Sequence, residues 1–455
     1  GPTMVSALFL CGLINILTMF SYSELSAAIP KVGGEYTYTK AAFGGLTAFM
    51  AGCLRWLASV FGGALAAVVF AQQLAYFFSI LIPMAEHFIL INTPLIAAII
   101  VIILAALDIR GIKEATTLIV FAFLAIFAVF LASGLWYGLT PPEVLPRPSP
   151  EGLSGFFAAT AYTFTMFVGM RALVAGAPQI KDPEKNVPKA LLLSTVLLTV
   201  VYCGVAYVAV GVVPGEASVE SPLLNFAAER IMSGIGGILF AIAGMIASVS
   251  SVGTAMMVQS SILGGMSRDG YMPKVLLRVH RRFGTRYVAV IASSLFVILF
   301  SAIGAVEFLG YAASFGSLLV FALVNLSLMK LREKEPHLKR PFKAPLYPIT
   351  PIAGIVMSFL LLTFPVLLRD VNAESALISG LGLVALVLTT YYLRMVGRYR
   401  LRVALGGVSL GMGALLALLA PLLIPRFPLY VLIFVSAVSI LGGVLNVAAH
   451  VRKIL

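Results

Sequence analysis

The sequence is built from long apolar stretches that are separated by short polar gaps. About thirteen such stretches occur, most of them close to the ~20 residues that a helix needs to cross the hydrocarbon core of a bilayer. They are continuous rather than alternating, which excludes a transmembrane β-barrel. We therefore predict an all-α protein that crosses a membrane many times. The expected crossings lie near 4–22, 46–80, 92–107, 115–138, 152–176, 190–213, 233–260, 286–305, 307–329, 348–369, 374–394, 401–424 and 428–449.

The basic residues of the gaps indicate the orientation. Most of the 31 Lys and Arg residues fall in every second gap and in the C-terminal tail, whereas the acidic residues divide evenly between the two sets of gaps. Cytoplasmic loops of membrane proteins carry an excess of Lys and Arg. The sequence thus predicts a cell membrane protein with a cytoplasmic C-terminus. These loops also account for the net charge of +13, so we expect contact with a lipid bilayer and no nucleic-acid partner.

Motifs of enzymes and metal sites do not occur in the sequence. There is no Walker glycine loop, GxSxG elbow or HExxH helix. The three cysteines are single residues within apolar stretches, and the four histidines are scattered near loops. Neither an enzyme nor a metal site nor a cofactor is expected. Transport without nucleotide hydrolysis is the class of function that remains.

Five polar segments in the basic gaps carry distinctive patterns of glycine, proline and charge. The first follows the first apolar stretch and reads SYSEL at 21–25 and IPKVGGEYTY at 29–38. Its glycines and proline stop a helix, and its aromatic and charged residues suit a segment that re-enters the membrane interface. The others are DIRGIKEA at 108–115, KDPEKNVPKA at 181–190, SRDGYMPK at 267–274 and EPHLKRPFKAP at 335–345.

Together and in this order, the five segments resemble cytoplasmic loops of the amino acid-polyamine-organocation superfamily of permeases. The resemblance implies an inverted repeat of the leucine-transporter type, in which two five-helix halves surround a substrate site at the midplane and the first helix of each half is broken. It implies a transporter core over 1–345 and four additional C-terminal helices over 346–455. The first stretch matches the second helix of the family, so we expect the family's first helix to be absent and about 13 of 14 helices to be present.

The resemblance places the remaining broken helix at 152–176. Its sequence from Thr160 to Arg171 is rich in hydroxyl groups and contains a glycine near its end. Backbone groups released from a helix need partners inside a bilayer, which a substrate or water can supply. The alternative is an unbroken helix whose threonines bond back to their own turn. The predicted substrate-binding residues are Thr163, Phe164, Thr165, Phe167, Val168, Gly169 and Arg171.

Two arginines, Arg55 and Arg171, lie inside apolar stretches, where a charge is costly unless it faces a cavity or a partner. Arg171 is suited to attract a carboxylate-bearing side chain or to occupy the volume of a coupling cation. The structural alternative is that it extends toward the cytoplasm or pairs with an acidic loop residue. For Arg55, beside Trp56, we expect extension toward the cytoplasm.

The coupling ion stays open between H⁺ and Na⁺. Ser250 and Ser251 match two hydroxyls that help to hold sodium in some relatives, although small hydroxyl residues also serve close packing between helices. Residues 115–138 contain no lysine, so the lysine that stands in for sodium in some proton-coupled relatives is not matched. The loop from Pro83 to Pro94 contains no cysteine, so no disulfide-linked accessory subunit is expected.

The expected function is secondary active transport of amino acids or related amines by alternating access. The alternative is a non-transporting membrane protein that keeps this fold as a sensor or an assembly partner.

Overall fold

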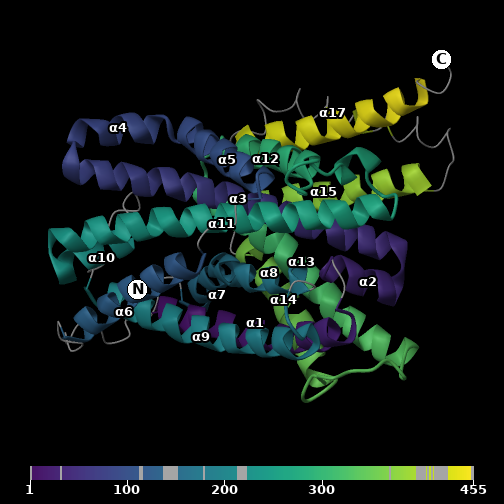
Figure 1. Ribbon diagram of the computed structural model, residues 1–455, viewed down its shortest axis with the longest axis horizontal. Helices are drawn as coiled ribbons and strands as arrows, with labels where there is room; N and C mark the ends of the chain where they lie inside the picture. The colour runs from purple at the N-terminus through teal and green to yellow at the C-terminus, as the bar shows by residue number, and fades with distance from the viewer. Residues whose placement is uncertain are drawn as a thin grey trace.

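A computed structural model of the chain describes residues 3–30, 33–111, 116–136, 152–177, 180–212, 223–367, 370–395 and 429–451, with a few isolated positions between 406 and 413. Helices joined by turns make up these residues, and no strand occurs among them. The long helices lie side by side along one common direction (Figure 1). The all-α class is therefore confirmed.

Each of the other twelve predicted crossings contains a helix, and the crossing at 401–424 lies almost wholly outside the described residues. Seven helical segments of the described chain are long and apolar enough to cross a membrane, and five shorter apolar helices accompany them. The helices within the predicted crossings are α1 (Thr3–Ala28), α3 (Gly45–Leu81), α5 (Thr93–Ile109), α6 (Thr116–Trp136), α7 (Gly152–Thr163), α9 (Pro183–Val212), α11 (Gly234–Arg268), α12 (Tyr287–Ser301), α13 (Val306–Lys334), α14 (Ile349–Leu367), α15 (Val371–Met395) and α17 (Leu429–Val451).

Shorter helices join these elements. A 3₁₀-helix, η2 (Phe164–Arg171), and α8 (Ala172–Ala175) continue α7. The remaining short helices are α2 (Glu35–Phe43), α4 (Pro83–Ile91), α10 (Leu223–Met232) and the 3₁₀-helix η4 (Lys274–Leu277). Several of them stand at helix ends, where the chain turns between two long helices (Figure 1).

The re-entrant segment after α1 owes its turn to two glycines. Gly33 and Gly34 have φ angles of 112° and 48°, a region that side chains with a Cβ atom rarely adopt. The chain reverses there and enters α2, whose first residue is Glu35. The turn thus brings an acidic residue back toward the helices instead of leaving it in a loop.

Helix α13 is the centre of the described fold. Of its apolar window, 78% is buried, whereas the other six membrane-length segments reach only 33–44%. It contacts α1, α2, α3, α7, η2, α14 and α15. Side chains along α13 therefore face several neighbouring helices rather than lipid.

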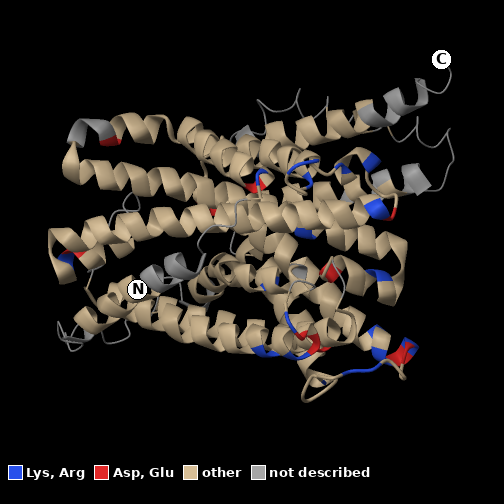
Figure 2. Ribbon diagram, viewed as in Figure 1, with Lys and Arg blue, Asp and Glu red and all other residues tan. Residues whose placement is uncertain are grey.

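The charged residues gather toward one end of the helices. Figure 2 shows most of the described Lys and Arg near α2 and the C-terminal ends of α11 and α13, on the right of the view. This end carries the loops that the sequence predicts to be cytoplasmic, and it is called the basic end below.

Candidate substrate site and contacts at the basic end

The α-helical winding stops in the middle of the segment expected to be broken. Helix α7 ends at Thr163, and the eight residues of η2 follow as a 3₁₀-helix. Runs of 3₁₀-helix longer than about four residues are uncommon and often mark functional hinges. The threonines before the change, Thr160 and Thr163, donate hydrogen bonds of 2.8 Å to the carbonyls of Phe156 and Ala159. The local bonding that was the alternative therefore occurs in α7, while the backbone of η2 departs from the α pattern.

The predicted substrate-binding residues contact different neighbouring helices in the structure. Phe164 and Arg171 both lie against Phe321 of α13, with 5.3 Å between the two phenyl centroids and 4.8 Å from the guanidinium carbon to the Phe321 centroid. Phe167 instead contacts Tyr202 of α9, with ring centroids 5.3 Å apart. Of the others, Thr163 is buried, Thr165 and Val168 are half-buried, and Gly169 is exposed.

Arg171 is fully buried, with 0% of its surface exposed. Its Nη2 donates to Ser317 Oγ at 2.8 Å, and its Nε lies 3.4 Å from the carbonyl oxygen of Val168. Nη1 has no hydrogen-bond partner, and no carboxylate of the described residues pairs with the guanidinium. Extension of Arg171 to the cytoplasm is therefore wrong, and no acidic loop residue within the described part of the chain pairs with it.

Arg55 is buried as well, but it is neutralised. Its Nε lies 3.1 Å from Glu35 Oε1, and the two side chains are 4% and 3% exposed. The Tyr22 hydroxyl donates to the same carboxylate oxygen at 3.2 Å. The expected extension of Arg55 into cytoplasmic water is wrong because the re-entrant segment delivers a carboxylate to the arginine. A second hydrogen bond to that carboxylate helps to offset the cost of burying the pair.

Ser250 and Ser251 lie on α11, where Ser250 is half-buried and Ser251 is exposed. Within the described residues, neither hydroxyl makes a side-chain hydrogen bond. Their role in binding a coupling ion stays a prediction.

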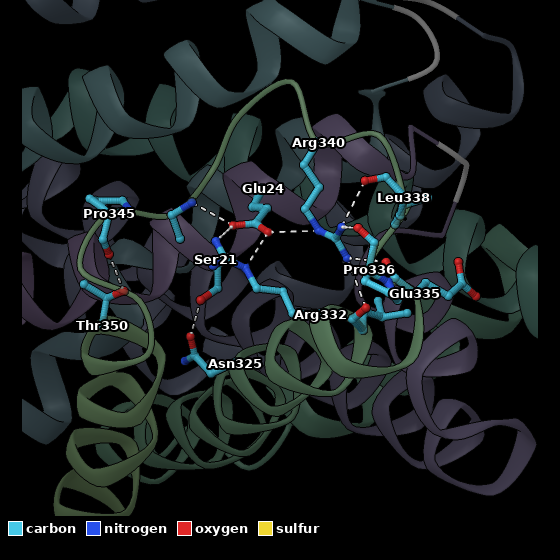
Figure 3. Close-up of polar contacts among 12 residues, drawn as sticks. Ser21, Glu24, Asn325, Arg332, Glu335, Pro336, Leu338, Arg340, Pro345 and Thr350 are labelled. Carbon is cyan, nitrogen blue, oxygen red and sulfur yellow. Dashed lines mark hydrogen bonds and ion pairs between the residues drawn. The ribbon is translucent and has the colours of Figure 1, made fainter.

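A buried ion cluster closes the basic end between α1 and α13. Glu24, 0% exposed, accepts hydrogen bonds from Arg332 Nε at 2.9 Å and Nη2 at 2.6 Å, and from the backbone N–H of Ala344 at 2.7 Å. Arg340 Nε lies 3.2 Å from Glu24 Oε1. Figure 3 shows both guanidinium groups converging on this one carboxylate. The cluster ties the end of α1 to the end of α13 and to the segment that follows it.

A second contact at the basic end joins α2 to the end of α11. Lys40 Nζ lies 2.7 Å from Asp269 Oδ1, and the Tyr36 hydroxyl donates to Asp269 Oδ2. Burial favours a raised pKa for this carboxyl, but the hydrogen bonds from Lys40 and Tyr36 outweigh it and hold the pKa of Asp269 below its ordinary value. Asp269 is therefore ionised at neutral pH and bridges two parts of the fold.

Comparison with known proteins settles the class of the molecule. The sequence profile of the amino acid permease family matches residues 1–388. The chain belongs to the amino acid permease family.

Relatives and a solved structure agree with this assignment. The permease is 29% identical to the methylthioribose transporter of Bacillus subtilis, over 79% of this chain and 80% of the relative. It is 28% identical to the branched-chain amino acid permease BcaP of the same organism, over 80% of each chain. The structure of the Eremococcus coleocola manganese transporter shares the fold, with a TM-score of 0.54 at 15% identity, over 85% of this chain and 88% of that one. The permease is therefore a multi-pass membrane transporter, and the sensor alternative is not favoured.

The partners of the buried arginines are the residues that sequence reasoning missed. Glu35 of the permease lies in the paired-glycine segment, and Ser317 and Phe321 lie on α13. One signal for α13 is present in its sequence: Ser314, Gly316 and Ser317 are small residues within an apolar stretch, a composition typical of close helix contacts. Which small residue meets which arginine follows only from the fold.

Proposed function

We propose that this permease carries amino acids or related amines across the plasma membrane by alternating access, with η2 and the facing part of α13 forming part of the substrate site. The change from α7 to η2 is the observation that supports this most. It changes the backbone hydrogen-bond pattern beside two buried side chains, Phe164 and Arg171, which together offer an apolar wall and a cation. Sites for small molecules combine mostly apolar walls with a few placed polar groups.

The basic end faces the cytoplasm in this proposal, and so does the C-terminus. The Glu24 cluster and the Lys40–Asp269 contact lie at that end and hold it closed. Both contacts separate when the site opens to the cytoplasm, because they join helices that move apart as one group of helices rocks against the other. Residues 1–345 act as the transporter core, and 346–455 supply the additional helices.

The protein acts as a carrier and catalyses no covalent step. It works without a nucleic acid and without a disulfide-linked accessory subunit, since the Pro83–Pro94 loop lacks the cysteine that such a link needs. The coupling ion is H⁺ or Na⁺, and Ser250 and Ser251 are its candidate ligands on α11.

Uptake by proteoliposomes tests the proposal. The full-length protein is reconstituted and assayed with radiolabelled amino acids and amines, with and without gradients of pH and sodium. We expect protein-dependent accumulation of at least one amino acid, and a gain from one of the two gradients. Uptake equal to that of protein-free liposomes across the whole panel contradicts the proposal.

A pair of variants tests whether η2 is part of the substrate site. Phe164→Ala removes a fully buried ring that contacts Phe321, whereas Phe359→Ala makes the same change at a ring on α14 that is 46% exposed. We expect the first to raise the KM for uptake by about tenfold or more and the second to leave it unchanged, with both proteins eluting as single species in detergent. Equal effects on KM would remove η2 from the site.

A further inference from the structure

Arg171 is a full charge enclosed by groups that do not neutralise it. The groups that contact it among the described residues include a hydroxyl, a backbone carbonyl and the ring of Phe321, all of them uncharged. Enclosing an ion without a counter-charge is costly, even after relaxation of the protein. One of its donors, Nη1, is left without any partner although 0% of the side chain is exposed.

The neighbouring charges leave the positive charge of Arg171 unbalanced. Arg55 and Glu35 form a pair of one positive and one negative group, so Arg171 remains as the unbalanced cation of this region. A further cation brought to this place is therefore opposed, and an anion is favoured by the same charges.

The surroundings select the kind of anion. Phe164 and Tyr22 lie edge-on to Phe321, at centroid distances of 5.3 Å and 5.6 Å, and Arg171 lies over the same ring. A small hydrated inorganic ion gains little from such aromatic walls, whereas a carboxylate on an apolar body matches both the cation and the rings. The planar guanidinium and a planar carboxylate can also share two parallel hydrogen bonds.

We propose that Arg171 holds the carboxylate of the substrate, and that it thereby restricts the permease to amino acids without a net positive charge. Cationic amino acids and amines that lack a carboxylate are rejected, because they bring a positive charge to Arg55 and Arg171 with no compensating partner. This inference rests on the proposed function and narrows it. Ser317 acts as a positioning residue: its hydroxyl donates to the carbonyl of Ala313 at 2.7 Å and accepts from Arg171 Nη2.

The first test uses the unmodified protein and matched ligands. The shift in melting temperature of the purified full-length protein is measured with leucine, leucinamide, lysine and putrescine, and each is then used to inhibit uptake of the best substrate. Leucinamide keeps the side chain and the amine of leucine but has no carboxylate. We expect leucine to bind at least about tenfold more tightly than leucinamide, and no binding of lysine or putrescine. Binding of lysine or putrescine as tight as that of leucine overturns the inference.

The second test assigns the discrimination to Arg171. Arg171→Met keeps much of the side-chain length and removes the charge, and Arg171→Lys keeps the charge but loses the planar fork. We expect the ratio of leucinamide to leucine inhibition constants to fall to about one in the Met variant and to an intermediate value in the Lys variant. A purely structural arginine predicts equal losses for both ligands and an unchanged ratio. If neither variant folds, the ligand series on the unmodified protein still decides the outcome.

Two further arms separate the remaining explanations. Melting in chloride and in chloride-free isethionate buffer shows whether an inorganic anion occupies the site; a stabilisation by chloride that leucine does not displace overturns the inference. Failure of the proposed function itself has a different signature. In that case no amino acid of the panel is transported, whereas transport without discrimination between acid and amide refutes only the role of Arg171.

Discussion

Single residues at the basic end make several buried hydrogen bonds and ion pairs of this permease. Glu24 is enclosed by two arginines and a backbone N–H, and each donor belongs to α13 or to the segment after it. Arg332 also lies over the ring of Tyr347, 3.9 Å from its centroid. Removing the negative charge leaves two guanidinium groups facing each other without a counter-ion.

Glu24→Gln is therefore expected to destabilise the protein strongly, by about 3–5 kcal/mol, because one partner of a buried ion cluster is lost. Glu333→Gln is the matched control. Glu333 pairs with Lys330 at 3.2 Å on the surface, where its side chain is 69% exposed, and such a pair contributes at most about 1 kcal/mol. Denaturant unfolding in detergent micelles measures both variants. Similar losses in the two proteins would show that the Glu24 cluster is not the stronger contact.

Asp269 gives a prediction about pH. Its pKa is lowered in the folded protein, so its contribution to stability is present above the ordinary value of 3.8 and is lost as the pH falls through the folded pKa. The difference in stability between the unmodified protein and Asp269→Asn is expected to be constant from pH 8 to about pH 5 and to shrink below about pH 4. It should not exceed about 1 kcal/mol, since Lys40 is 43% exposed. Thermal melts across this pH range check it; a difference that grows on acidification contradicts it.

At the scale of the element, α13 depends on close backbone contact with α3. A Cβ atom added at Gly316 would lie 2.9 Å from the carbonyl oxygen of Leu54 and 3.1 Å from the Cβ of Ala58. The backbone of α3 cannot move aside as a flexible side chain would. The separation of these two helices is thus set by the absence of a side chain at one position.

Gly316→Ala is expected to lower stability by about 1–3 kcal/mol through overpacking and to reduce uptake, since Ser317 beside it contacts Arg171. Gly382→Ala on α15 makes the same change where no atom lies within 4 Å, and it should be neutral or slightly stabilising. Unfolding midpoints of both variants are compared with that of the unmodified protein. An equal response of the two variants would exclude overpacking at Gly316 as the cause.

The helices could be predicted from sequence far better than the site could. Continuous apolar stretches bounded by glycine, proline and charge marked all of the described long helices, because the bilayer imposes the length of a crossing. The arginines could be recognised as unusual for the same reason. Their partners could not, since Glu35 reaches Arg55 only through the turn at Gly33 and Gly34, and Ser317 is far from Arg171 in sequence. The direction of each side chain in η2 depends on 3₁₀ winding, which the sequence of Phe164 to Arg171 does not reveal.

For the whole molecule, the basic end defines an orientation that labelling can test. Lys339 and His87 are both exposed, in the segment after α13 and on α4 respectively. In a cysteine-free background, we expect a membrane-impermeant maleimide to modify His87→Cys in intact cells and Lys339→Cys only in inside-out vesicles. Modification of Lys339→Cys from outside would invert the proposed topology.

The contacts at the basic end and the substrate site act in one transport cycle in this account. In the proposed cycle, two contacts hold the basic end closed, and the unbalanced charge of Arg171 lies in η2 against α13. The coupling ion of the permease is still open between H⁺ and Na⁺. An exchange assay that needs no ion gradient is therefore the most direct test of carrier activity.

Solute counterflow is that measurement. Proteoliposomes are loaded with an unlabelled neutral amino acid, diluted into a trace of the labelled compound, and sampled over time. With leucine as the neutral amino acid, the account predicts a transient accumulation of label that decays to equilibrium. The accumulation is abolished when leucinamide replaces leucine on both sides of the membrane. Label that enters no faster than into protein-free liposomes, for every amino acid tried, would contradict it.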